Sequence, residues 1–307
     1  MKKILLTLIL GFNILYSLSQ NCHIAFTPLV IPSSTGGDNT QVDNYLYNRL
    51  RSLILNNGGI AIENNQFAIA ISYDILNKQV LSGIPIKIVY NLNISMFIVD
   101  TNNKKIYSSF NTEVKGIGDS ETKALINCFK GIGLANNNIK QFIEKGEKGI
   151  IDYYDNNYQK IIAKATSDAA LKNFDTAIYA LLCIPECCKG YEAALIHLPV
   201  IYKQFVNQHC NENLAQARAA WYASPNSDGA SVAGVYLSEI YPDAACYKDA
   251  MDLFKEIKRQ LGEEWKFMMK QYNDAVAIET QRMEMMREIA IAYAKNQPKE
   301  TINIFCK

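Results

Sequence analysis

The sequence predicts an α+β N-terminal domain, in which helices pack on an antiparallel sheet, followed by an all-α helical-repeat C-terminal domain. Two patterns predict this class. Residues 66–118 alternate apolar and polar side chains and are rich in β-branched residues, which is typical of strands. After about residue 150 the alternation stops, and alanine-rich segments with helical periodicity follow. We therefore expect two domains, at 20–150 and 151–307.

The chain opens with the features of a Sec-type signal peptide over residues 1–19. Lys2 and Lys3 precede the apolar run "ILLTLILGFNILYSL", and Ser17 and Ser19 are the small residues of a cleavage site. The run is shorter than the roughly 20 apolar residues of a spanning helix, so we expect cleavage before Gln20 and no membrane span afterwards. A signal retained as an anchor is the alternative. We expect the protein to be exported, either to the periplasm or to the cell surface and medium.

Charge argues against two classes of partner. Acidic and basic residues nearly cancel, giving a net charge of +1, and no run of Lys or Arg stands out. Nucleic acids and anionic membrane surfaces are bound through clusters of basic residues. We therefore expect neither as a partner.

Apolar spacing predicts the first elements. Residues 23–31, "HIAFTPLVI", predict a strand, and the polar "PSSTGGDNTQ" after them predicts a loop. A helix follows, because apolar residues recur at helical spacing until Asn57, Gly58 and Gly59 stop it. Those apolar residues are Val42, Leu46, Leu50, Leu53 and Ile54. Residues 66–81, 84–100 and 104–118 then predict antiparallel strands, with a turn at 100–105 between the last two.

Two glycines, Gly116 and Gly118, stand just before the next predicted helix, as they would in a phosphate-binding loop. We expect them to allow unusual backbone angles between a strand and a helix capped by Asp119 or Ser120. A dinucleotide fingerprint would carry glycine or alanine where Glu121 stands, and the lysine and hydroxyl of a P-loop are absent. The predicted buried face of the helix is Ala124, Leu125, Cys128, Phe129 and Ile132. We expect no nucleotide or other cofactor.

The order of these segments is similar to that of a known domain. The segments are "AFTPL", "LYNRLRSLILNNGG", "FIVDTNNKKIYSS" and "GIGDSETKALINCFKGI". Over residues 22–150 they resemble the α+β domain of penicillin-binding-protein activator lipoproteins and of the periplasmic part of the curli secretion channel. The resemblance implies a non-catalytic adaptor that docks to other envelope proteins. This chain lacks the family's lipobox, in which small residues directly precede a cysteine, because Gln20 and Asn21 precede Cys22. We therefore expect no lipid anchor.

The C-terminal part contains an internal repeat. Residues 174–205 align with residues 230–261 at one constant offset of 56, and we single out five of the identical pairs that result. The pairs are Ala177 with Ala233, Leu181 with Leu237, Ile184 with Ile240, Tyr191 with Tyr247, and Ala194 with Ala250. The pattern predicts two helices joined by a Pro-containing turn, and "SDAALKNFDTAIYALLCIP" resembles a tetratricopeptide repeat pair. We expect a short helical solenoid, with an irregular bundle as the alternative.

The sequence after Tyr247 predicts a long C-terminal helix, since Gly262 is almost its only breaker. An apolar stripe along it either packs on the repeats or forms a partner face, because the flexible thioether of methionine suits adaptable binding surfaces. The candidate partner face comprises Trp265, Met268, Tyr272, Met283 and Met286.

The cysteines predict disulfides, because eight of them, an even number, occur in a chain expected to be exported. The candidates are Cys183, Cys187, Cys188, Cys210 and Cys246, and their connectivity does not follow from the sequence. A zinc site is the alternative, since "CIPECC" and "HC" supply thiols and an imidazole. Their spacing departs from the paired C-x2-C units of zinc sites, so we expect no metal.

Catalytic chemistry has few candidate residues. The histidines are His23, His197 and His209, and neither G-x-S-x-G nor H-E-x-x-H occurs. We expect no catalytic residue and no enzyme activity. The sequence is interpreted as an exported scaffold that binds envelope proteins or self-associates. The alternative is an exported binding protein that holds a small ligand or peptide between the two domains.

Overall fold

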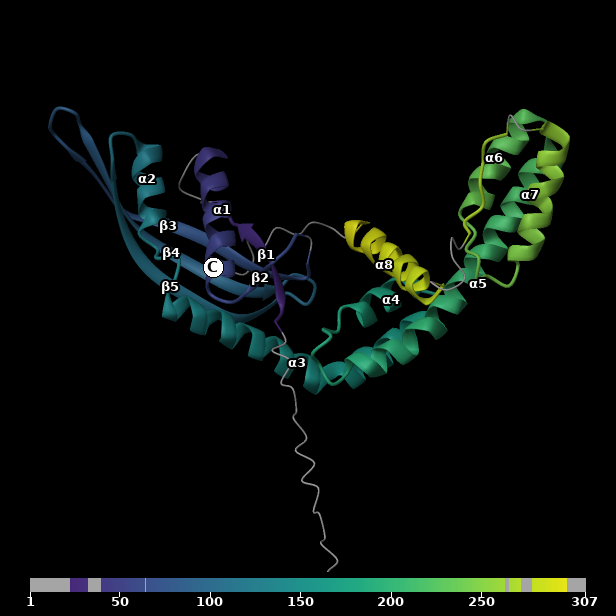
Figure 1. Cartoon of the computed structure of the whole chain (residues 1–307), viewed down its shortest axis with the longest axis horizontal. Helices are drawn as coiled ribbons and strands as arrows, with labels where there is room; N and C mark the ends of the chain where they lie inside the picture. The colour runs from purple at the N-terminus through teal and green to yellow at the C-terminus, as the bar shows by residue number, and fades with distance from the viewer. Residues whose placement is uncertain (1–22, 33–39, 64, 263–264, 272–277, 297–307) are drawn as a thin grey trace, which may run out of the picture.

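The computed structural model describes residues 23–32, 40–63, 65–262, 265–271 and 278–296. A sheet with its helices lies at one end, and long helices lead away from it to the other end (Figure 1). The strands are β1 (Ala25–Val30), β2 (Ile60–Ala61), β3 (Phe67–Leu81), β4 (Lys87–Asp100) and β5 (Lys105–Gly118). The helices are α1 (Thr40–Asn56), α2 (Glu121–Lys130), α3 (Asn137–Ala170), α4 (Phe174–Leu182), α5 (Tyr191–Ala223), α6 (Ser227–Ser238), α7 (Tyr247–Leu261) and α8 (Ile278–Asn296).

The sheet is mixed, with the strand order β2-β1-β3-β4-β5. β3, β4 and β5 pair antiparallel over long registers, for example Tyr73 with Ile94 and Met96 with Phe110, which confirms the three predicted strands. β1 runs parallel to both of its neighbours. The two-residue β2 was not predicted, because a segment that short carries no period.

One face of the sheet forms the core. Leu92, Ile94, Met96 and Ile98 of β4 are buried, whereas the residues between them, among them Asn93, remain partly exposed. This alternation is that of an antiparallel sheet covered on one face. The five apolar residues predicted for the first helix are all buried in α1. The face predicted for the second helix is likewise buried in α2 and at Ile132 just after it.

Gly116 and Gly118 act through close packing, which corrects the expected reason for them. Both lie within β5, paired with Tyr90 and Ile88 of β4, and neither has a positive φ. A Cβ at Gly116 would lie 2.3 Å from the carbonyl oxygen of Ala124, and one at Gly118 would lie 2.4 Å from the same residue's nitrogen. The glycines therefore let the backbone of α2 approach the strand directly.

α3 is a continuous helix that links the sheet to the remaining helices (Figure 1). Gly146 packs on Ile98 of the sheet, where a Cβ would come within 2.2 Å of the isoleucine side chain. Residue 150, the expected domain boundary, lies in the middle of α3. The division into two domains therefore stays a prediction, and the two parts share one helix.

The repeat at offset 56 recurs in the hydrogen bonds of the two turns. The amide of Ile184 donates to Leu181 and that of Ile240 to Leu237, each at 3.2 Å. Further equivalent backbone bonds are Cys188 to Pro185 with Ala244 to Tyr241, and Tyr191 to Cys188 with Tyr247 to Ala244. The two copies therefore share one turn geometry, whereas a tetratricopeptide identity stays a prediction.

The long C-terminal helix was predicted wrongly. α7 ends at Leu261, because Gly262 adopts φ 78°, a left-handed angle that favours glycine and ends a helix. Residues 265–271 are not helical, and α8 begins only at Ile278. α8 returns to α4, where Tyr293 packs on Tyr179 with ring centroids 5.2 Å apart.

We predict that Gly118→Val lowers the free energy of unfolding by about 1–3 kcal/mol, the usual cost of forcing extra atoms into a packed contact. Gly133→Val is the matched control, because a Cβ there would meet only the carbonyl oxygen of Ala135, at 3.7 Å. Urea unfolding measures both variants. Equal stability of the two would contradict the packing role of Gly118.

Glu147 of α3 provides a second prediction, on pH. Its carboxylate accepts a hydrogen bond from the amide of Ile24 at 3.1 Å, and His23 Nδ1 lies 3.6 Å away. Burial raises its pKa above the unperturbed 4.5, so the unfolded chain ionises first as the pH rises. As the pH rises, Glu147 therefore lowers the free energy of unfolding from about pH 4.5 until the pH has passed its folded pKa.

Glu147→Gln should remove this contribution, since glutamine keeps an oxygen for the amide of Ile24 but does not ionise. Between pH 4 and pH 7, the free energy of unfolding should fall less in this variant than in the unmodified chain. Glu113→Gln, at an exposed position on β5, is the control and should leave the profile unchanged. Identical profiles for all three proteins would contradict the prediction.

Candidate functional site

The glycine-containing junction of β5 and α2 is occupied by its own acidic side chains. Ser120 caps α2, and its hydroxyl accepts a hydrogen bond from the amide of Lys123 at 3.2 Å. Glu121 accepts hydrogen bonds from Lys78 Nζ at 2.6 Å and from the hydroxyl of Tyr90 at 2.8 Å. The hydrogen bond from Lys78 lowers the pKa of Glu121, so the first turn of α2 carries a carboxylate where a phosphate would have to bind.

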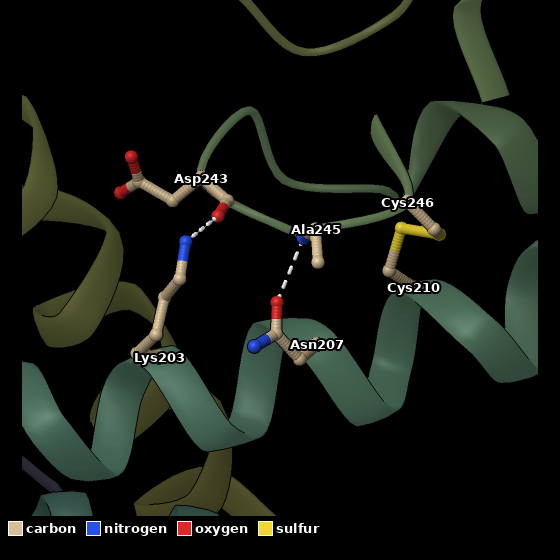
Figure 2. Close-up of a disulfide and its surroundings, with 6 residues drawn as sticks. All are labelled: Lys203, Asn207, Cys210, Asp243, Ala245 and Cys246. Atoms are coloured by element: carbon tan, nitrogen blue, oxygen red, sulfur yellow. Dashed lines mark hydrogen bonds between the residues drawn. A yellow bond between two sulfur atoms is a disulfide. The ribbon is translucent and has the colours of Figure 1, made fainter. Parts of the chain in front are cut away.

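A disulfide joins Cys210 of α5 to Cys246 just before α7, with their Cα atoms 6.0 Å apart (Figure 2). Two hydrogen bonds from the same face of α5 support it. The side-chain oxygen of Asn207 accepts from the amide of Ala245 at 2.7 Å, and Lys203 Nζ donates to the carbonyl of Asp243. Successive turns of α5 thus hold the whole connection between α6 and α7.

The remaining candidate cysteines divide into two kinds. Cys187 is also in a disulfide. Cys183 and Cys188 are free thiols, which corrects their status as candidates. Burial raises the pKa of both to about 12, and Cys183 accepts a hydrogen bond from the side-chain amide of Asn102 at 3.6 Å. Their sulfurs therefore belong to packed contacts, and neutral buried thiols are poor nucleophiles.

The three histidines lie in three separate environments. His209 stacks on Phe205 with ring centroids 5.3 Å apart, and burial lowers its pKa. His23 lies beside Glu147, and His197 is exposed on α5. Across the described residues, no group of three or more His, Cys, Asp or Glu side chains could hold a metal ion.

The candidate partner face is not one continuous surface. Trp265 and Met286 are buried within the protein, and Met283 packs against the same core. Met268 is 80% exposed. Tyr272 lies outside the described residues. Most of this apolar stripe is therefore used inside the chain. Trp265 and Met268 lie in the non-helical segment after α7, whereas Met283 and Met286 lie on α8.

An apolar surface that sequence reasoning missed lies on the hairpin between β3 and β4. Its residues 76–87, which we call the tip hairpin, are all exposed and project beyond α2 (Figure 1). The exposed large aliphatic residues there are Leu76, Val80, Leu81, Ile84 and Ile86, and Ile84 is fully exposed. Ile88 pairs with Gly118, the last residue of β5, so residues 81–87 lie past the end of that strand.

A signal for the tip hairpin was present in the sequence. No acidic residue occurs between Asp74 and Asp100, and "VLSGIPI" places aliphatic residues on both sides of Gly83, where a solvated turn would be polar. Alternation alone could not distinguish these residues from core, because it reports which residues share a face and not whether anything covers that face.

Comparisons with known proteins show limited likeness. No protein-family model and no curated protein matches the chain. A minor lipoprotein from Acinetobacter baumannii is 15% identical with a TM-score of 0.24, and the match covers 39% of this chain and 90% of that one. A candidate lipoprotein from Caulobacter crescentus CB15 is 12% identical with a TM-score of 0.21, covering 40% and 83%. At such TM-scores, neither carries an argument about the function of this chain.

None of the described helices combines the length with the hydropathy that crossing a bilayer requires.

We predict that digestion of the unreduced protein yields one peptide pair linked through Cys210 and Cys246, whereas Cys183 and Cys188 alkylate once the chain is denatured. Replacing Cys210 and Cys246 by Ser should lower the free energy of unfolding by about 2–4 kcal/mol, because the cross-link restricts the unfolded chain. The oxidised unmodified protein is the reference. Alkylation of Cys210 without a reductant would contradict the prediction.

Proposed function

We propose that this protein is an exported, non-catalytic adaptor that binds a protein partner of the cell envelope or a second copy of itself through the tip hairpin. The observation that carries the proposal is the exposure of five large aliphatic residues on one projecting hairpin. An exposed apolar patch on a soluble domain commonly marks an interaction site.

The groups that could carry chemistry support the same proposal through their structural roles. Glu147 accepts a hydrogen bond from the amide of Ile24, just before β1, and Asp100 is fully buried at the end of β4, where its carboxylate holds the turn to β5. Cys183 is partly buried and Cys188 is buried, and burial raises the pKa of both thiols. These side chains hold elements together, which leaves exposed surface such as the tip hairpin for a partner.

Two further observations fit export. The expected signal peptide would send the chain out of the cytoplasm, and disulfides such as that between Cys210 and Cys246 persist in oxidising compartments. The alternative of a small ligand held between two domains stays a prediction.

The test compares the unmodified protein with the double variant Leu81→Asp/Ile84→Asp. Both side chains are exposed, so the fold should be retained while the apolar tip is lost. Light scattering over a range of protein concentrations measures self-association, and cross-linking in envelope extract followed by mass spectrometry measures a partner. We expect the tip variant to lose the association at least tenfold.

Leu171→Asp is the matched control, because Leu171 is also an exposed leucine but lies at the C-terminal end of α3. It should behave like the unmodified protein. If the tip variant keeps every association, or if Leu171→Asp abolishes the same ones, the tip hairpin is not the docking surface.

A further inference from the structure

Residues 265–271 lie against α6 as an extended chain (Figure 1). Trp265 and Met269 are buried, whereas Lys266 and Met268 are exposed, and Phe267 lies half-buried between them. A two-residue period of burial is that of an extended chain whose alternate side chains enter a surface. The segment is therefore positioned as an extended peptide ligand would be.

The first anchor of the segment is Trp265. Its indole Nε1 donates a hydrogen bond at 3.1 Å to the carbonyl oxygen of Ala230, near the start of α6. Its ring packs on Phe254 of α7, with centroids 4.9 Å apart. The tryptophan thus enters a site made by both helices, and its one polar group is satisfied there.

The second anchor is Phe267, which lies over Gly234 of α6. A Cβ on Gly234 would come within 2.4 Å of the phenyl ring. Ala230 and Gly234 are four residues apart and both buried, so they form a smooth floor one helical turn long. The aromatic residues at positions one and three of the segment match this floor.

The third anchor is Lys270. Its Nζ lies 3.1 Å from a carboxylate oxygen of Glu239 and 4.1 Å above the ring centroid of Tyr241. The hydroxyl of Tyr247 donates to the carbonyl oxygen of Lys270. An acidic group, an aromatic face and a backbone contact thus surround a lysine five residues after the tryptophan.

Side chains dominate this attachment. Among the residues that the structure describes, no backbone-to-backbone hydrogen bond joins residues 265–271 to the helices. Because the attachment is made through side chains, truncating them can remove it. We propose that the groove formed by Ala230, Gly234, Glu239, Tyr247 and Phe254 is a peptide-binding site for extended segments of the pattern Trp-x-Phe-x-x-Lys, which residues 265–270 occupy in cis.

The cis segment competes with any peptide added in trans. A tethered ligand acts at an effective concentration in the millimolar range, so the unmodified protein binds an added peptide only weakly. Truncating the two aromatic anchors empties the groove without changing the helices that form it.

The experiment measures binding of a fluorescein-labelled peptide with the sequence of residues 265–271, "WKFMMKQ", by fluorescence anisotropy. The proteins are the full unmodified chain, the variant Trp265→Ala/Phe267→Ala and the milder variant Phe267→Ala. We expect saturable binding to the double variant, at least tenfold tighter than to the unmodified chain, with Phe267→Ala between them. Circular dichroism and cooperative thermal unfolding establish that each variant is folded.

Two controls separate groove binding from adhesion. A peptide with both aromatic residues replaced by alanine should not bind. Gly234→Ala, added to the double variant, should abolish binding of the original peptide, because its methyl group occupies the place of the phenyl ring, while alanine favours the helix. If Phe267→Ala and every other folded emptied variant fail to bind the peptide, or if the alanine peptide binds equally well, the inference is wrong.

This inference does not rest on the proposed function. The Leu81→Asp/Ile84→Asp change leaves the groove intact, so an emptied protein that also carries it should still bind the peptide. Failure of the tip hairpin as a docking surface is therefore distinguishable from failure of the groove.

Discussion

The carboxylate of Asp100 is fully buried, and it accepts hydrogen bonds from the amides of Asn102 and Asn103, from the side chain of Asn103 and from the hydroxyl of Tyr154. A buried carboxylate is tolerated only where its oxygens are satisfied in this way. Because Tyr154 belongs to α3, the bond at 3.1 Å attaches the long helix to the turn between β4 and β5. The side chain of Gln66, just before β3, donates a hydrogen bond to the carbonyl of Cys183 at the C-terminal end of α4. This bond attaches α4 to the same end of the sheet. The direction in which the helices leave the sheet depends on these contacts.

The connections from α4 to α5 and from α6 to α7 are held at equivalent positions, but by different interactions. In the first turn, the side chain of Asp155 accepts from the amide of Lys189, and Tyr158 packs on Gly190. In the second turn, Asn207 accepts from Ala245, which is the position equivalent to Lys189, and the pair equivalent to Tyr158 and Gly190 is the disulfide between Cys210 and Cys246. The contact of Tyr158 with Gly190 and the disulfide between Cys210 and Cys246 thus occupy equivalent positions in the two copies. Equivalent residues of the long helices α3 and α5, such as Asp155 and Asn207, are 52 positions apart, whereas equivalent residues of the turns are 56 apart. An alignment at one offset therefore finds the turns and misses the helices that hold them.

Features that depend on one element were predictable, and features that depend on contact between distant elements were not. The buried faces of α1 and α2 follow from helical spacing, and Leu50 and Cys128 lie where their periods place them. Periodicity placed Trp265 on the apolar stripe of an expected helix, but its partners Ala230 and Phe254 come from α6 and α7. The glycines of β5 were recognised for their backbone freedom, whereas their use is the close approach of α2, which no local pattern encodes. Likewise, the strand pattern of β3 continues to Leu81, although the side chains of the tip hairpin are exposed.

The apolar surface on α6 and α7 is covered by the chain itself, whereas that on the tip hairpin is exposed, and this difference affects binding. On α6 and α7 the chain covers the apolar floor with its own Trp265 and Phe267, so a partner there must displace a tethered competitor. On the tip hairpin, Leu81 and Ile84 are exposed, so a partner meets no competing segment among the described residues. Binding at the tip is then limited by the encounter and by the area buried, whereas binding at the groove is limited by how often residues 265–271 open. A partner that carried both an apolar surface and an extended aromatic segment would engage the tip first, and the raised local concentration would then favour exchange at the groove.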